Sequence, residues 1–392
     1  MRSLTFEKSH LPLVGIILLI AASLVYLGLQ LRTNPVDEAI KSDRILDILV
    51  ILEEKGKPVS TQLFFYYPAT GKGAVLDLPG DLGLIIKSVN KVDRIDSVYQ
   101  AGRPQAYVSE LSRLLATEIP LWLVFDEKGL GRVCDLLEGV EIFLPEAVDS
   151  KGPPRVLLPS GATTLDGDKL VQYAGWSPPD EDDAEASSRR QRLYQSLVRK
   201  IGGRSDWITR ADVFPTFRDC VGTNLGSEGL RKFVREIARI DIDHLVMQRV
   251  TGTRRAVDRN ILLFPHYDGD LVRDIVKQTL NALASSTGAL ADKIYTVEIL
   301  NGTPLKGLAN RTAEIFQSFG YDVVSVGNAD REDYPRTEIL YRSVGREAAA
   351  GLGEVIQCGN VAPDPGATPR SDADFTIILG SDFNGRYVNG NR

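Results

Sequence analysis

The 392-residue sequence predicts an α/β protein with a membrane anchor and two globular parts. Three observations lead to this prediction. A long apolar stretch lies near the N-terminus, short apolar runs alternate with amphipathic segments over most of the chain, and a small, polar stretch separates off a second, smaller set of such elements. Strands that alternate with helices indicate helices packed in layers against a sheet.

The apolar stretch Leu11–Leu31 is the first element. A helix of this length rises about 30 Å, which is enough to cross the hydrocarbon core of a bilayer. Arg2 and Lys8 precede it, so residues 1–10 are expected to form a cytoplasmic tail. A cleaved signal peptide is the alternative, but no small-x-small site follows the apolar core. We expect a single-pass protein of the cytoplasmic (inner) membrane whose bulk is extracytoplasmic or periplasmic.

Apolar runs and helical periodicity define the larger globular part, expected at residues 32–283. Runs bounded by turn-forming residues predict the strands Ile45–Leu52, Leu63–Tyr67, Ala74–Leu78, Leu121–Phe125 and Val140–Leu144. Apolar residues at helical spacing predict helices that begin near Pro104, Asp126, Ser188, Ser227 and Leu271. Asp126 is placed to cap its helix, because a carboxylate accepts the free backbone N–H groups of the first turn.

The smaller part is expected at residues 293–383, after a linker at residues 284–292 and before a tail at residues 384–392. Its pattern is strand, helix, strand, and its glycines end the predicted elements. The predicted strands are Ile294–Leu300, Tyr321–Val326, Glu338–Tyr341 and Phe375–Leu379. Helices are predicted around Leu308–Phe319 and from Arg346. The whole is a small α/β domain.

Composition argues against a nucleic-acid binder, a disulfide framework and a histidine metal site. The net charge of −6 argues against a nucleic-acid binder. Cys134, Cys220 and Cys358 are far apart and odd in number, so we expect three buried thiols instead of a disulfide framework. The three histidines show no metal-ligand spacing.

Two resemblances follow from these segments. Residues 294–383 resemble the LytR C-terminal domain, through Val297–Thr303, Gly307–Ala309, Gly320–Val323, Gly327–Asp330, Tyr334–Thr337 and Leu379–Phe383. The larger part is similar to the LytR-CpsA-Psr (LCP) catalytic domain, through Tyr67–Ile85, Arg94–Tyr99, Leu165–Tyr173, Arg190-Gln191, Thr223–Leu225 and Leu263–Pro265. The expected fold is therefore an anchored LCP-like α/β domain followed by a small α/β domain.

The second resemblance implies a function. Proteins of this family are membrane-anchored and transfer a glycopolymer from a polyprenyl pyrophosphate carrier to peptidoglycan. That chemistry needs an apolar slot, carboxylates that hold Mg²⁺ and arginines that bind the pyrophosphate. Asp47 lies near the family's first-strand aspartate, and Asp81 matches that of its Pro-Arg-Asp motif; both are implied Mg²⁺ ligands. Arg94 and Arg190 match two basic positions, so Asp81, Arg94 and Arg190 are the implied catalytic residues.

Each of these residues also has a local interpretation. Asp47 can be a satisfied buried polar group in an apolar strand. Asp81 follows Pro79-Gly80, a place where aspartate is favoured in turns. Arg94 and Arg190 can form surface salt bridges.

The sequence also departs from the family's pattern. Gly80 stands where the family has an arginine, Ala174-Gly175-Trp176 replaces an Arg-x-Arg pair, and another arginine position falls near Ser187. None of these side chains supplies a guanidinium fork for a diphosphate. Arg189 and Arg192 are the neighbouring cations that could compensate.

Two functions are therefore weighed. The first is a degenerate family member that binds an envelope lipid-phosphate or glycan, or organises other envelope proteins as a scaffold. The alternative is an active, Mg²⁺-dependent glycopolymer phosphotransferase. An unrelated extracytoplasmic module for transport or secretion is the remaining possibility.

Overall fold

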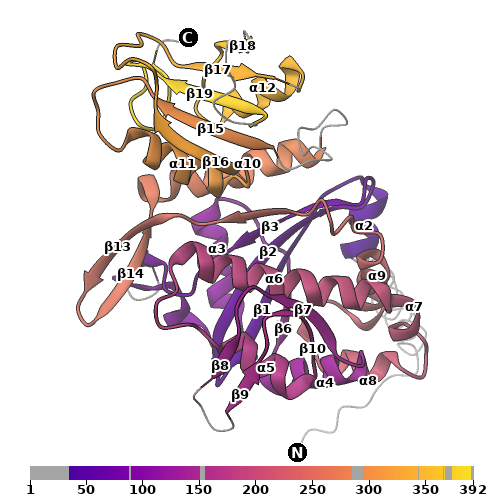
Figure 1. Cartoon of the computed structure of the whole chain (residues 1–392). Coiled ribbons are helices and arrows are strands. Elements are labelled where there is room, and N and C mark those ends of the chain that lie inside the picture. The colour runs from indigo at the N-terminus through magenta and orange to yellow at the C-terminus, as the bar shows by residue number, and fades with distance from the viewer. Residues whose placement is uncertain are drawn as a thin grey trace, which may run out of the picture.

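The computed structural model describes residues 35–87, 90–150, 155–284, 295–342, 344–364, 366 and 373–389. In these ranges the chain forms a larger α/β domain followed by a smaller one (Figure 1). The expected anchor at residues 11–31, the tail before it and most of the expected linker lie outside the described residues. Within the described ranges, no helix has the length and apolar character needed to cross a membrane.

A six-stranded sheet forms the centre of the larger domain. Its strand order is β11 (Gly222–Thr223), β6 (Leu121–Phe125), β1 (Leu46–Glu54), β2 (Lys57–Tyr67), β3 (Lys72–Asp77) and β12 (Val246–Arg249). β2 is antiparallel to both β1 and β3, whereas β1 is parallel to β6 and β3 to β12. Gln62 on β2 lies opposite Val50 on one side and Asp77 on the other. β1 and β3 therefore run in the same direction.

Helices cover both faces of this sheet. On one face, Val50, Phe64 and Val75 belong to a core with α4 (Glu127–Leu136), α6 (Asp183–Gly203) and α9 (Ser227–Ile237). On the other face, Leu49 and Phe65 belong to a core with α3 (Gln105–Leu115) and α10 (Asp270–Ala284). Alternate residues of one strand point to opposite faces, so strands covered on both sides are apolar nearly throughout.

Four two-stranded ribbons and several short helices complete the larger domain. The ribbons are β4 (Gly83–Ile86) with β5 (Lys91–Arg94), β7 (Val140–Leu144) with β10 (Gly161–Leu165), β8 (Val148–Ser150) with β9 (Val156–Leu158), and β13 (Gly252–Val257) with β14 (Asn260–Pro265). The helical segments are α2 (Pro35–Lys41), η2 (Ile95–Val98), α5 (Gly167–Gly175), α7 (Ser205–Ile208), α8 (Phe214–Arg218) and η3 (His266–Gly269).

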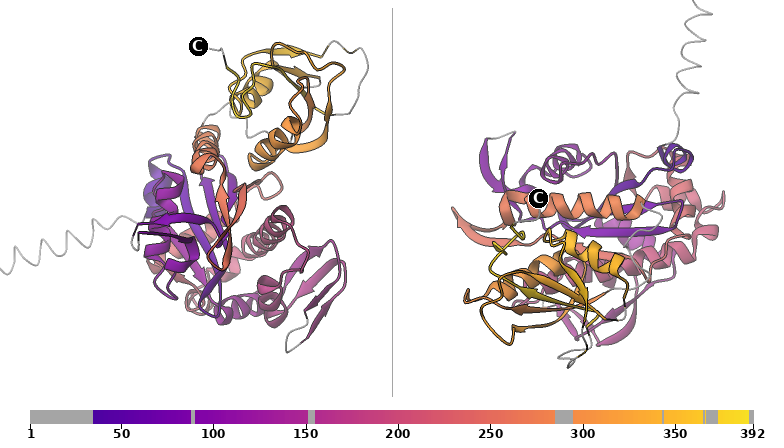
Figure 2. Two further views of the ribbon diagram at one scale, coloured as in Figure 1. Left: turned by 90° about the vertical axis from the view of Figure 1, so that its left-hand side faces the viewer. Right: turned by 90° about the horizontal axis from the view of Figure 1, so that it is seen from above.

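The smaller domain is a five-stranded sheet with two helices. Its strand order is β16 (Asp322–Asn328), β15 (Thr296–Asn301), β19 (Phe375–Leu379), β17 (Glu338–Tyr341) and β18 (Val361–Pro363), and its helices are α11 (Leu308–Ser318) and α12 (Arg346–Glu354). The end of α11 contacts β12 of the larger domain, where Gln248 Nε2 donates to the Phe319 carbonyl at 3.4 Å. Asp274 of α10 accepts hydrogen bonds from Arg386 and Tyr387, each at 2.6 Å. The two domains are thus in contact (Figure 2).

Most predicted elements are confirmed. Leu121–Phe125, Val140–Leu144, Glu338–Tyr341 and Phe375–Leu379 are strands with the predicted bounds. Asp126 caps α4 by accepting the Gly129 N–H at 2.6 Å, and the three cysteines are buried free thiols. The predicted start of α6 near Ser188 is wrong. The helix begins at Asp183, because Asp182 and Glu185 form a capping box within the acidic run.

Candidate functional site

A polar pocket of about 350 Å³ lies between the end of β3, the first half of α6 and the β13–β14 ribbon. Ionisable side chains from segments far apart in the sequence line it. Asp77 ends β3, Arg94 ends β5, Asp183 and Arg190 belong to α6, and Arg254 belongs to β13. The loop at residues 78–81, which carries Asp81, closes one side.

The first arginine of the pocket is fully engaged by a buried carboxylate. Arg190 donates from Nε and Nη2 to the two carboxylate oxygens of Asp77, at 2.8 and 2.5 Å. Asp77 is 0% exposed and also accepts a hydrogen bond from the Gln62 amide. Burial alone would lower the pKa of Arg190, but the charge and the hydrogen bonds of the adjacent Asp77 together outweigh it and raise that pKa. Asp77 thus favours the charged form of Arg190.

The second arginine has a partner on its own segment. Arg94 donates from Nε and Nη2 to the two carboxylate oxygens of Asp96. These hydrogen bonds raise the pKa of Arg94. The Asp96 carboxylate also fills the space beside Gly80, where an added Cβ would lie 2.8 Å from Asp96 Oδ2. The position at which the family has an arginine is thus occupied by a carboxylate of this chain.

The third arginine, Arg254, bridges two carboxylates. Its Nη1 donates to Asp81 at 2.8 Å, and its Nε donates to Asp183 at 2.9 Å. The hydrogen bond with Asp183 is the main reason why the pKa of Arg254 is raised. The charge of Asp81 is therefore balanced by Arg254, a residue of the β13–β14 ribbon that the sequence analysis missed.

The two arginines proposed as substitutes lie elsewhere. Arg189 donates to Glu181 at 2.6 and 3.0 Å and lies over the Trp176 ring. Arg192 lines a different groove, on the other side of α6. Ser187, where the family has an arginine, lines the polar pocket and is 2% exposed, yet its Oγ has no hydrogen-bond partner.

Asp47 is not part of this pocket. It pairs in register with Phe65, three residues along β2 from Gln62, a separation of about 10 Å. Asp47 also points to the same side of β1 as Leu49 and Ile51, whose side chains face α3 and α10. Asp77 points to the other side of the sheet, toward α6, as Val75 does. Burial raises the pKa of Asp47 to about 7, and its Oδ1 has no partner.

The predicted Mg²⁺ ligands are therefore not brought together. Asp47 lies on the sheet face that α3 and α10 cover, whereas Asp81 lies in the loop that closes the polar pocket and already binds Arg254. Across the part of the chain that the structure describes, no group of three or more His, Cys, Asp or Glu side chains is arranged to hold a metal ion. The residues present do not fit the Mg²⁺ site that the family resemblance implied.

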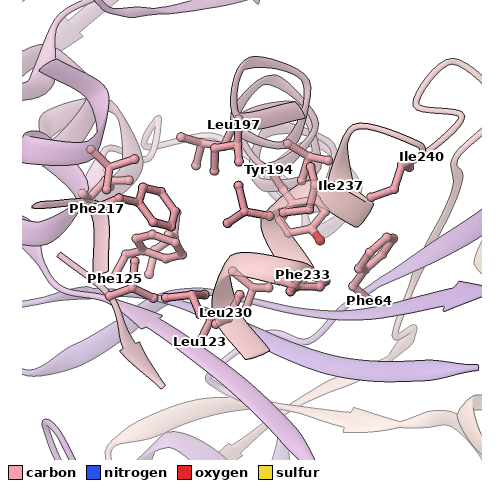
Figure 3. Close-up of a pocket in the computed structure, with 18 residues that line it drawn as sticks. Phe64, Leu123, Phe125, Tyr194, Leu197, Phe217, Leu230, Phe233, Ile237 and Ile240 are labelled. Carbon is pink, nitrogen blue, oxygen red and sulfur yellow. The ribbon is translucent and has the colours of Figure 1, made fainter. Parts of the chain in front are cut away.

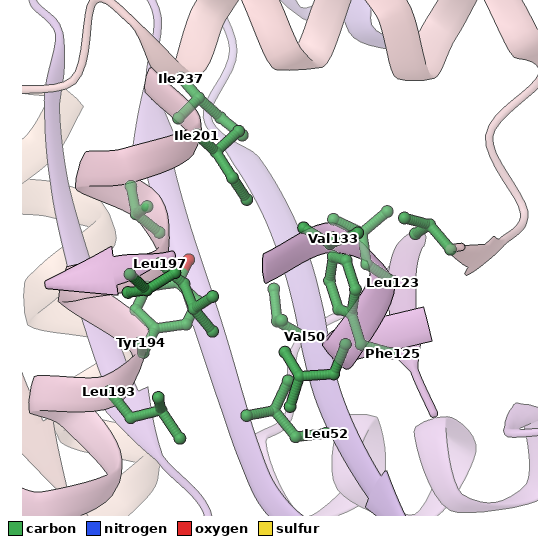
Figure 4. Packing of buried hydrophobic residues seen from close by; sticks show 14 of the residues in the cluster. Val50, Leu52, Leu123, Phe125, Val133, Leu193, Tyr194, Leu197, Ile201 and Ile237 are labelled. Carbon is green, nitrogen blue, oxygen red and sulfur yellow. The ribbon is translucent and has the colours of Figure 1, made fainter. Parts of the chain in front are cut away.

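An apolar cavity lies next to the polar pocket, between α6, α9 and the same face of the sheet (Figure 3). Arg190 faces the polar pocket, and Tyr194, Leu197 and Ile201 follow at helical spacing on the same side of α6 and line the cavity. The cavity measures about 40 Å³. Figure 4 shows how side chains of α6 and of strands β1 and β6 approach each other across it. The polar pocket and the apolar cavity thus follow each other along α6.

Comparisons with known proteins establish the class of this chain. The family model LytR_cpsA_psr matches residues 58–279, which is more than half of the chain, so the protein belongs to the LytR-CpsA-Psr family. A second model, described as LytR cell envelope-related transcriptional attenuator, matches residues 294–383. The first match begins at residue 58, so Asp47 lies outside it. No curated protein matches the chain.

Solved structures share the fold of the larger domain. TagV of B. subtilis is 17% identical, with a TM-score of 0.54, over 61% of this chain and 98% of TagV. A protein from Streptococcus agalactiae is 15% identical, with a TM-score of 0.54, over 62% and 90% of the two chains. TagT bound to LI-WTA is 15% identical, with a TM-score of 0.50, over 62% and 91%. At these identities the likeness defines the fold alone.

Proposed function

We propose that this protein is a membrane-anchored cell-envelope protein that holds an envelope glycan without transferring it. Residues 11–31 would anchor the chain in the cytoplasmic membrane and leave the two domains outside the cytoplasm. Membership of the LytR-CpsA-Psr family supports an envelope role. A relative of the same fold, TagT, has been solved with LI-WTA, a wall teichoic acid ligand, which supports a glycan partner.

The observation that carries the proposal is that each arginine of the polar pocket is paired with carboxylates of the chain. Arg94, Arg190 and Arg254 point their guanidinium forks at Asp96, at Asp77, and at Asp81 with Asp183, respectively. A diphosphate would have to displace these partners. Breaking the buried Arg190–Asp77 pair costs about 3–5 kcal/mol, because it leaves a buried charge uncompensated, whereas the Arg94 and Arg254 side chains are each 42% exposed and their pairs oppose displacement less. Diphosphate recognition is therefore opposed by the site's own ion pairs.

The small size of the apolar cavity also argues against binding of a polyprenyl carrier. A cavity must offer about 10–15 Å³ to hold one water molecule, so 40 Å³ holds a few water-sized groups. A polyprenyl tail of many carbons needs far more room, and α6 or α9 would have to move away from the sheet to admit it.

One observation favours the alternative, an active transferase. The polar pocket and the apolar cavity follow each other along α6, which is the order that a lipid with a charged head requires. If a lipid-linked ligand opens the cavity and separates the ion pairs, the arginines become free to bind its phosphates. The proposal and this alternative thus differ in the state of the arginines when a diphosphate is present.

Binding of farnesyl pyrophosphate, measured by isothermal titration calorimetry with and without Mg²⁺, distinguishes the two. We expect no measurable binding to the natural protein. The Asp183→Asn variant keeps the side chain's size but releases Arg254 from one charge, and we expect it to gain affinity. Asp212→Asn, which frees Arg210 away from the pocket, is the matched control and should gain none. Tight, Mg²⁺-dependent binding to the natural protein would contradict the proposal.

A further inference from the structure

A second groove, of about 600 Å³, lies between the far side of α6 and the β7–β10 ribbon. α6 packs beside β7, and Figure 2 shows the helix alongside the ribbon. The residues that line it do not line the polar pocket or the apolar cavity. This groove is therefore separate from the site described above.

The groove is basic on a chain that is acidic overall. Four cations, Arg192, Arg199, Lys200 and Arg204, line it with one acid, Glu141, so the cations that line the groove outnumber the acids. The whole chain carries −6. A local excess of one sign in a concave surface raises the concentration of ligands of the opposite sign.

The cations are also accessible to a ligand. Lys200 forms no ion pair in the described part of the chain. Arg199 and Arg204 pair with Asp243 and Glu138, whose side chains are 74% and 71% exposed. Exposed pairs of this kind contribute little, so a ligand anion can replace these partners. This contrasts with the buried pair of Arg190 in the polar pocket.

An aromatic ring completes the groove. Phe143 alternates with buried residues along β7, lines the groove and is 61% exposed. Gln195 and Ser196 on α6 add amide and hydroxyl groups. A flat ring beside hydrogen-bonding groups suits a sugar ring, which presents C–H bonds on its face and hydroxyls at its edge. Cations that end a helix satisfy its dipole, but that role explains neither Arg192 in the middle of α6 nor Phe143.

We propose that this groove binds an anionic glycan, in which Phe143 stacks against a sugar ring and Arg199, Lys200 and Arg204 bind its phosphate or carboxylate groups. The inference does not depend on the proposed function, because it uses none of the residues of the polar pocket. It gives the protein a second contact with an envelope polymer, on the side of α6 opposite the polar pocket.

The test measures binding of fluorescent oligogalacturonate, a carboxylated glycan, to the full-length protein in nonionic detergent. Glucose 6-phosphate tests a phosphorylated sugar, and maltohexaose tests a neutral glycan of similar length. We expect oligogalacturonate to bind, with an affinity that falls as salt rises, and maltohexaose to bind at least tenfold more weakly. The Arg199→Gln/Lys200→Gln variant should lose about tenfold or more in affinity, as expected for charge-assisted hydrogen bonds. Phe143→Ala should lose affinity for both glycans.

Matched controls come from the neighbouring β8–β9 ribbon. Arg155 and Leu157 are an exposed cation and an exposed apolar side chain that do not line the groove. Arg155→Gln and Leu157→Ala should bind as the natural protein does. Three results would overturn the proposal: no binding of either anionic sugar, equal losses in the control variants, or equal affinity for inorganic phosphate or a single-stranded oligonucleotide, which would indicate unspecific attraction of anions.

Discussion

Asp77 and Arg190 form the buried ion pair of the polar pocket. Asp77 has no exposed surface, and the Arg190 side chain is 13% exposed, so removing one partner leaves the other charge buried. We expect Asp77→Ala to lower the free energy of unfolding by about 3–5 kcal/mol. Arg94→Ala should cost about 1 kcal/mol or less, because its side chain is 42% exposed. Urea unfolding measures both, and equal losses would contradict this distinction.

Asp47 predicts a pH dependence of stability. Burial raises its pKa from 3.8 to about 7, so the folded protein holds a proton that the unfolded chain releases. Stability from this group is present below about pH 4 and is lost as the pH rises through 7. The pKa difference corresponds to at most about 4 kcal/mol.

The variant Asp47→Asn should therefore be more stable than the natural protein at pH 8, with little difference at pH 4. Thermal unfolding at a series of pH values measures this. Asp149→Asn, at an exposed carboxylate, is the control and should keep the natural pH dependence. A natural-like slope in Asp47→Asn would show that the carboxylate is solvated in the folded state.

At the scale of elements, one buried polar network joins α6, β12, α10 and α11. Gln191 of α6 donates to the Gln248 carbonyl at 2.6 Å. The Gln248 amide donates to Thr279 Oγ1 of α10 at 2.9 Å and to the carbonyl of Phe319 after α11. Because Gln191 follows Arg190 directly, this network links the wall of the polar pocket to the C-terminal domain.

Gln248→Ala leaves Thr279 and the Phe319 carbonyl short of a partner. We expect a loss of about 1–3 kcal/mol in stability. Gln105→Ala, at an exposed glutamine on α3, should change stability by about 0.5 kcal/mol or less. Denaturant unfolding in which the control loses as much as Gln248→Ala would argue against the network.

Sequence patterns predicted elements more reliably than the site. Strands such as Leu121–Phe125 are apolar because both faces of the sheet are covered, so a local pattern identifies them. The partner of Arg190 is 113 residues away, and the two partners of Arg254 are 173 and 71 residues away; no local pattern reveals such pairs. Asp77 did carry a signal, since it ends a strand next to the Pro79-Gly80-Asp81 turn. Arg254 lies on an exposed ribbon and carried none.

At the scale of the whole molecule, the composition predicts one anchor and a soluble remainder. A chain that begins at Arg32 lacks the apolar stretch and keeps both domains. We expect it to be folded and to remain in the supernatant after ultracentrifugation, while the full-length chain sediments with membranes. Circular dichroism checks the fold of the truncated chain. Sedimentation of the truncated chain with purified lipid vesicles would contradict the single-anchor model.

The central claim is that the arginines of the polar pocket are held by the protein's own carboxylates. The most direct test is glycan transfer from a polyprenyl pyrophosphate-linked donor to peptidoglycan with Mg²⁺, followed by mass spectrometry beside an active family member. Charge-assisted hydrogen bonds contribute about 1.5–3 kcal/mol each, so losing several costs about 10³-fold or more in rate. The account predicts no transfer above the enzyme-free background. Mg²⁺-dependent transfer that disappears in Asp81→Ala or Arg190→Ala would contradict it.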